Sequence, residues 1–151
     1  MFFLVHLLSF LLLSSMVQIC HAVCLDRSLE EREEMANVVV TGTVKKVMLD
    51  DRDSNRGMYK SEIEIKRVLK GENVVNQLAN FIDPVRQHKM VMVDGFGDPH
   101  ICENEVHVAD TKIFLLNKGY NGELRLNSSI LPITVVNLNY AEAVVKGSNH
   151  C

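Results

Sequence analysis

Two stretches of the chain predict a long β-hairpin, and this feature restricts the fold more than any other. Residues 38–49 (VVVTGTVKKVML) are rich in β-branched side chains and alternate towards their end, which predicts a long strand with a bulge at Gly42. A polar loop follows at residues 50–57, and residues 59–69 (YKSEIEIKRVL) then alternate as a half-buried strand does. The chain is therefore expected to be rich in β-structure.

Three further stretches predict shorter strands, at residues 89–94, 111–117 and 123–126. The last two are joined across a Gly/Asn turn at residues 118–122. Residues 130–136 either complete the sheet or lead into a last helix, and residues 74–81 show no clear pattern.

Helices are predicted at both ends of the domain. Residues 26–36 carry acidic residues early and good helix formers throughout, which predicts a short helix capped by Asp26. A second helix is predicted at about residues 137–146 and is ended by Gly147. Short strands between two helices predict a mostly β domain, for which an OB-type five-stranded β-barrel with flanking helices fits.

The first 22 residues are predicted to be a signal peptide. Residues 1–17 are almost wholly apolar, and they are followed by a cleavage site that ends at Ala22. The apolar block is shorter than the roughly 20 residues of a membrane-spanning helix, which argues against stable membrane insertion. Because no Lys or Arg precedes the leucines, an uncleaved anchor stays an alternative. Cleavage leaves one secreted domain at residues 23–147 and a flexible tail at 148–151.

Three cysteines remain after this cleavage, in an oxidising compartment. Cys24 and Cys102 lie beside segments that are predicted to fold, whereas Cys151 ends the tail. We therefore expect Cys24 to pair with Cys102 and Cys151 to be free or intermolecular, in which case the chain forms a disulfide-linked dimer.

The sequence gives no pattern that is typical of catalysis, of a metal or of a cofactor. Its net charge is −3 with both signs interspersed, so no basic patch indicates nucleic acid. The histidines of the mature chain are scattered, without the spacing of a zinc site, and no nucleophile elbow occurs. One processing motif is present, because Asn127-Ser128-Ser129 is an acceptor for N-glycosylation.

The predicted C-terminal helix carries one aliphatic stripe. Leu138, Ala141 and Val145 are spaced i, i+3 and i+7, so they share one helix face. From this periodicity alone, the stripe is expected to pack on the sheet.

Five runs that follow one another along the mature chain together carry a resemblance to a known family. They are EREEMANVVVTGTV (31–44), RVLKG (67–71), GFGDPHIC (95–102), ADTKIF (109–114) and ELRLNSS (123–129). In this order and spacing they resemble the N-terminal domain of agrin, a basement-membrane proteoglycan that this module tethers to laminin. The resemblance implies a secreted extracellular-matrix protein with a binding function and no catalysis.

The resemblance also implies a fold and a set of functional residues. The fold is an OB-type barrel similar to the inhibitory domain of tissue inhibitors of metalloproteinases, and the family's disulfide falls on Cys24 and Cys102. The laminin-contacting aliphatics fall on Leu138 and Val145, with Ala141 between them. An exposed aliphatic pair two turns apart can dock on a gamma-chain helix of laminin's coiled-coil arm.

Three departures from the family pattern stand out. The second cysteine pair aligns with Ser61 and Val144, so both halves are absent together. The loop between Phe114 and Glu123 is shorter than usual. None of agrin's follistatin-like, laminin G or glycosaminoglycan-bearing regions occurs before Cys151, which leads us to expect a stand-alone module or a truncated form.

Two other functions stay open. A metalloproteinase inhibitor of the related fold chelates zinc through the α-amino group and carbonyl of an N-terminal cysteine. Cleavage after Ala22 places Val23 ahead of Cys24 and blocks that geometry, whereas cleavage after Val23 restores it. Alternatively, the domain acts as a free competitor that occupies laminin sites without a tether.

Overall fold

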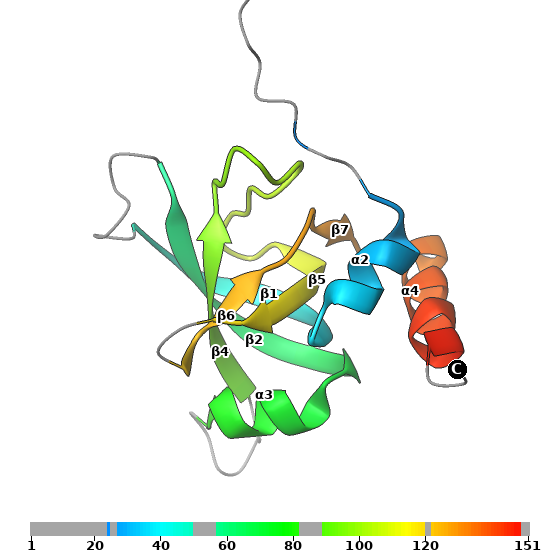
Figure 1. Ribbon diagram of the computed structural model, residues 1–151. Coiled ribbons are helices and arrows are strands. Elements are labelled where there is room, and N and C mark those ends of the chain that lie inside the picture. Colours follow the sequence, from blue (N-terminus) through cyan, green and yellow to red (C-terminus); the bar gives the residue numbers. More distant parts are fainter. Residues whose placement is uncertain (1–23, 25–26, 50–56, 82–88, 120–121, 149–151) are drawn as a thin grey trace, which may run out of the picture.

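The computed structural model describes residues 24, 27–49, 57–81, 89–119 and 122–148. The predicted signal peptide, Asp26 and Cys151 lie outside these residues. The elements in chain order are α2 (Leu29–Met35), β1 (Val38–Leu49), β2 (Tyr59–Lys70), α3 (Glu72–Leu78), β3 (Asn80–Phe81), β4 (Lys89–Phe96), β5 (Thr111–Lys118), β6 (Leu124–Leu126), β7 (Leu131–Pro132) and α4 (Val135–Ser148) (Figure 1).

Five of the strands close into a barrel. They neighbour one another in the order β1-β2-β4-β6-β5, and β5 pairs back with β1. The pairing of β4 with β6 is parallel, with Val93 opposite Leu124, and the other four pairings of the barrel are antiparallel. The short strands β3 and β7 extend this sheet beside β4 and β5. A closed five-stranded barrel with helices at both ends confirms the predicted OB-type fold.

Strands β1 and β5 separate two apolar clusters, because successive side chains of a strand point to opposite faces. The inner set belongs to the barrel core, which the buried Phe96 also fills: Val38, Val40, Phe114 and Leu116. The outer set belongs to a second cluster, between the barrel wall and the terminal helices: Val39, Ile113 and Leu115. Burial on both faces explains the continuous apolar runs VVV and IFLL in the sequence.

The predicted bulge at Gly42 is confirmed. The pairing of β1 with β2 shifts register between Thr41 and Gly42. A Cβ atom on Gly42 would lie 2.5 Å from Ile63 Cγ2 and 3.1 Å from the Glu64 carbonyl oxygen, so the neighbouring strand leaves no room for a side chain.

Several helix boundaries differ from the prediction. Helix α2 begins at Leu29, and its cap is Ser28, whose Oγ accepts a hydrogen bond from the Glu31 N–H at 3.3 Å. Helix α4 begins at Val135 and continues through Gly147, which the sequence placed at its end. Residues 130–136 were expected either to complete the sheet or to lead into the last helix. They do both, because they form β7 and then enter α4.

Helix α3 was not predicted. Gly71 precedes it with a φ of 78°, a left-handed conformation that favours glycine. The helix places Val74 and Val75 in the barrel core, and it covers the end of the barrel away from β7 (Figure 1). Its core residues Val74, Val75 and the partly buried Leu78 are spaced i, i+1 and i+4, a helical pattern of only three residues.

Candidate binding site on the terminal helices

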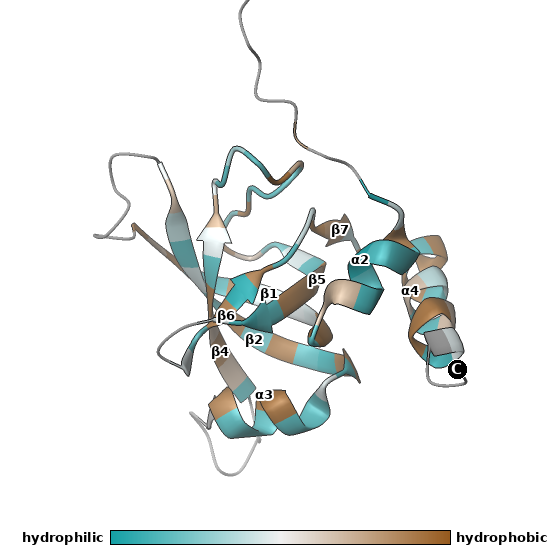
Figure 2. Ribbon diagram, in the orientation of Figure 1, coloured by the Kyte–Doolittle hydropathy of each residue, from teal (hydrophilic) through white to brown (hydrophobic). Residues whose placement is uncertain are grey.

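Helix α4 lies against the outer wall of the barrel, beside α2 (Figure 1), and apolar residues recur along it (Figure 2). Ala141 and Val145 are 2% and 6% exposed and belong to the outer cluster, and Leu138 is partly buried against it. The stripe therefore packs on the sheet, as its periodicity alone predicted. The expectation of an exposed aliphatic pair is wrong for the domain by itself, and the role of these residues in laminin binding stays a prediction.

Polar contacts fix the position of α4 on the barrel. The Glu142 carboxylate pairs with Arg67 of β2 at 2.5 Å and more distantly with Lys146 at 3.9 Å. At the other side of the helix, the Tyr140 hydroxyl donates a hydrogen bond to the Glu30 carboxylate of α2. This bond lowers the pKa of Glu30 and raises the pKa of Tyr140, because it favours the ionised carboxylate and the neutral phenol.

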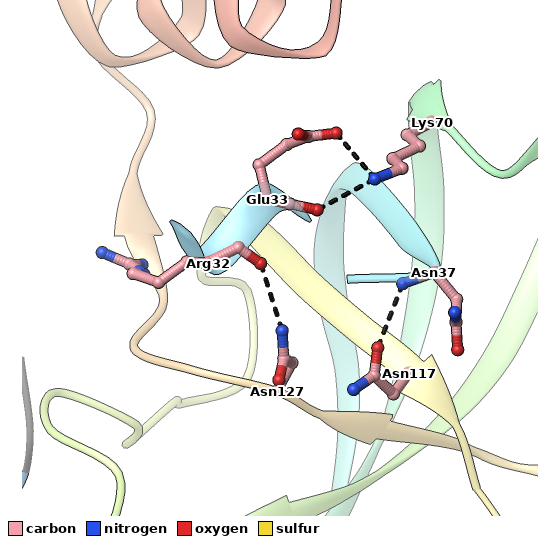
Figure 3. Close-up of polar contacts among 6 residues, drawn as sticks. All are labelled: Arg32, Glu33, Asn37, Lys70, Asn117 and Asn127. Atoms are coloured by element: carbon pink, nitrogen blue, oxygen red, sulfur yellow. Dashed lines mark hydrogen bonds and ion pairs between the residues drawn. The ribbon is translucent and has the colours of Figure 1, made fainter. Parts of the chain in front are cut away.

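Helix α2 and the residues that follow it are tied to the barrel by polar contacts (Figure 3). Lys70 Nζ lies 2.8 Å from Glu33 Oε1 and donates a hydrogen bond to the Glu33 carbonyl at 2.9 Å. Below the helix, the Asn37 N–H donates to Asn117 Oδ1 at 3.0 Å. The Glu33 side chain is only 3% exposed, so removing Lys70 would leave a charge in the interior.

The glycosylation motif adjoins this helix. Asn127 is half-buried, and its Nδ2 donates a hydrogen bond to the Arg32 carbonyl at 3.2 Å (Figure 3). The neighbouring Ser128 Oγ accepts from Arg32 Nε at 3.1 Å. The three residues of the motif therefore lie at the edge between α2 and the barrel.

Cys24 and Cys102 form a disulfide across 78 residues of sequence. It ties the segment before α2 to the loop after β4, beside a hollow of about 560 Å³. Val23, on which the metalloproteinase-inhibitor alternative depends, lies outside the described residues.

The positions that align with the family's second cysteine pair do not face each other. Ser61 is fully buried and shares its strand face with Ile63 of the barrel core, whereas Val144 lies on α4 outside the barrel. The buried Ser61 hydroxyl has no hydrogen-bond partner among the described residues.

One apolar surface was missed by the sequence reasoning. Val135 and Val136 are 77% and 74% exposed, and Tyr140 is 45% exposed. Val136 and Tyr140 share a face of α4 with Ala143, opposite to the face of Leu138 and Val145. The signal was the spacing i, i+4 and i+7 that starts at Val136, and it was lost because the helix was expected to begin at residue 137.

The described part of the chain contains no group of three His, Cys, Asp or Glu side chains that could hold a metal ion. None of the described helices is long and apolar enough to cross a membrane.

The comparison with protein families agrees with the resemblance in the sequence. The family model of the agrin NtA domain matches residues 30–148, which is most of the chain. The matched range includes all the described strands and helices, apart from Leu29, the first residue of α2. This family is one of binding domains rather than of enzymes. The chain therefore belongs to the agrin NtA domain family and is an agrin-like extracellular module.

Proposed function

We propose that this domain binds the coiled-coil arm of laminin, on its gamma chain, and that α4 is the docking element. The observation that carries the proposal is the family match together with α4, a 14-residue helix held in place on the outer wall of the barrel. Such a helix is about 21 Å long, enough to follow a partner helix for roughly four turns.

The attachment of α4 favours binding through any part of the helix that is exposed while it is packed on the barrel. Its ion pair with Arg67 and its contact with α2 through Tyr140 keep the helix in one orientation before the partner arrives. A helix that is already ordered loses less conformational entropy on binding than a flexible segment would. Two helices then pack by placing the side-chain ridges of one into the grooves of the other.

The contact residues that the resemblance implies are Leu138, Ala141 and Val145. Since Ala141 and Val145 are buried in the outer cluster, they can meet laminin only if α4 moves away from the barrel. Such a movement would expose the apolar wall formed by Ile113 and Leu115. Contact through these residues therefore implies a change of structure on binding.

The proposal is tested by measuring binding of the purified secreted domain to immobilised laminin. A Leu138→Ala/Val145→Ala variant is measured beside it, with circular dichroism as the check of fold. Saturable binding by the wild type supports the function, and loss of binding in a folded double variant would assign the contact to this face. If the wild type does not bind, the proposal fails, and N-terminal sequencing followed by a metalloproteinase-inhibition assay tests the alternative.

The same proposal includes secretion into the extracellular matrix, cleavage of residues 1–22, a domain at 23–147 and an N-glycan on Asn127. The Asn127 amide has two hydrogens, so a glycosylated side chain keeps one N–H for the Arg32 carbonyl. Glycosidase treatment of the secreted protein is expected to increase its electrophoretic mobility. An unchanged mobility would contradict the predicted N-glycan. Non-reducing electrophoresis in the same experiment tests the dimer through Cys151, which a purely monomeric band would exclude.

A further inference from the structure

The loop after β4 contains a chemically weak peptide bond, between Asp98 and Pro99. An Asp carboxylate can attack its own main-chain carbonyl carbon, and the nitrogen of a following proline is a good leaving group. Asp98 is half-buried, whereas Pro99 is exposed. Both residues line the hollow of about 560 Å³ beside the Cys24-Cys102 disulfide, so water can reach the bond.

The carbonyl oxygen of Asp98 accepts two hydrogen bonds. The Ile101 N–H donates one at 3.1 Å, and the Nδ2 group of Asn104 donates the other at 2.6 Å. Asn104 is only 5% exposed, so its amide is fixed by its surroundings and shielded from competing water. Two fixed donors on one carbonyl oxygen are the arrangement that stabilises the negative charge of a tetrahedral intermediate.

The carboxylate of Asp98 is also held in place. Its Oδ1 accepts a hydrogen bond from the His100 N–H at 2.9 Å, and its Oδ2 lies 3.6 Å from Nη2 of Arg125 on β6. The Asp98 side chain is 16% exposed, so it lies against the molecule rather than in open solvent. The attacking group and the carbonyl that it would attack are therefore both positioned by neighbouring residues.

The loop around this bond has little freedom to relax. Gly97 has a φ of 75°, and a Cβ atom on it would lie 2.6 Å from the Gly57 carbonyl oxygen. Glu103 has a φ of 41°, which is uncommon for a residue with a side chain, and its carbonyl accepts a hydrogen bond from the Ile130 N–H at 3.0 Å. Backbone strain of this kind is concentrated at functional sites in proteins.

We propose that the domain cleaves its own chain between Asp98 and Pro99. The Asp98 carboxylate attacks its own carbonyl carbon, and the Ile101 and Asn104 donors stabilise the oxyanion that forms. The bond to the Pro99 nitrogen then breaks, and this nitrogen takes a proton from water and leaves as a secondary amine. Asp98 is left as a cyclic anhydride, which the hydroxide from that water opens to two carboxyl groups. The net reaction consumes one water and involves no oxidation or reduction.

The two products of this cleavage stay together. The disulfide joins them, because Cys24 precedes the cut and Cys102 follows it. The pairings of β1 with β5 and of β4 with β6 also cross between the two products. Cleavage therefore gives a two-chain barrel with a new amino terminus at Pro99, and it does not depend on the proposed binding of laminin.

The test follows the purified secreted domain during incubation at neutral and at mildly acidic pH. We expect one band in non-reducing electrophoresis and two bands after reduction, one of which begins at Pro99 by N-terminal sequencing. The chain contains a matched bond, because Asp83 and Pro84 form a second Asp-Pro pair outside the described residues. In the folded protein we expect cleavage at Pro99 to be faster by about tenfold or more, and in urea with reductant we expect the two bonds to react alike.

Variants test the two groups that act on the bond. Asn104→Asp replaces the amide donor by a carboxylate and should slow cleavage by about tenfold or more, whereas Asn139→Asp makes the same change at an exposed position of α4 and should leave the rate unchanged. Asp98→Asn keeps an oxygen for the His100 N–H but removes the carboxylate, so cleavage there should also be slowed strongly. Circular dichroism checks that each variant is folded.

Three results would overturn the proposal. The first is an intact chain after prolonged incubation of the folded wild type. The second is equal cleavage of the two Asp-Pro bonds in the folded protein, which would show only their intrinsic lability. The third is an unchanged rate in folded Asn104→Asp. If that variant does not fold, the comparison of the two bonds in the wild type decides the question by itself.

Discussion

Replacing Val145 by Ala, beside the same replacement at Val136, measures the packing of α4 on the barrel. The two valines lie on opposite faces of one helix, and they are 6% and 74% exposed. Ala has the better helix propensity, by about 0.5 kcal/mol in a helix interior, and this gain applies to Val145 more fully than to Val136 in the first turn of α4. The difference between the two variants therefore reports mainly burial.

The expected magnitude follows from the two carbons that each replacement removes. At Val145 this costs about 1.6 kcal/mol, from about 0.8 kcal/mol per buried CH₂, plus a contribution from the cavity that remains. After the gain in helix propensity, we expect the free energy of unfolding to fall by about 1–2 kcal/mol. For a domain of this size that lowers Tm by about 4–8 °C. At Val136 we expect a change within about 0.5 kcal/mol.

Urea and thermal unfolding followed by circular dichroism, with the disulfide intact, measure both values. Equal stability of the two variants would refute the packing of Val145 on the barrel. Such a result would mean that a partner can reach that face of α4 without any movement of the helix. It would then favour Leu138 and Val145 as direct contacts.

Three other perturbations give clear expectations. Cys24→Ser/Cys102→Ser should lower the free energy of unfolding by about 4 kcal/mol, because the disulfide closes a loop across 78 residues, and urea unfolding measures the loss; an unchanged midpoint would show that the disulfide does not restrict the unfolded chain. Ser61→Ala should leave stability unchanged or raise it by up to about 1 kcal/mol, since it removes a buried hydroxyl without a partner, and a clear loss in the same assay would indicate a hidden hydrogen bond. Glu30→Gln should return the pKa of Tyr140 towards its ordinary value in an ultraviolet pH titration. In the wild type, the contribution of this hydrogen bond is present between the two ordinary pKa values of 4.5 and 10.0; it is lost as pH falls through the lowered pKa of Glu30 or rises through the raised pKa of Tyr140.

The β-barrel could be predicted from the sequence because its strands carry strong local signals. Residues 38–49 and 59–69 have the composition and alternation of strands, and the structure places both in the barrel. Helix α3 was not predicted, because its apolar pattern is only three residues long and the burial of Val74 and Val75 depends on the barrel end that they cover. Neighbours in space, rather than periodicity, decide its structure.

The candidate site shows the same division between local pattern and tertiary packing. The spacing of Leu138, Ala141 and Val145 predicted a shared helix face, and this is what the structure contains. Whether such a face contacts the barrel or a partner depends on where α2 and β5 lie. The periodicity of one helix gives no information on the positions of other elements. The exposed face of α4 that carries Val136 and Tyr140 was missed because it begins at Val136, one residue before the predicted start of the helix.

The closure of the barrel restricts how this domain can be recognised. Where a sheet is open, a partner can add a strand along its unpaired edge, and identical chains can join edge to edge. Here β1 pairs with both β2 and β5, so the five barrel strands offer no such edge over the length of these pairings. Strand addition and edge-to-edge self-association are then unavailable over these lengths, and a partner that binds there must contact side chains on the outside of the barrel.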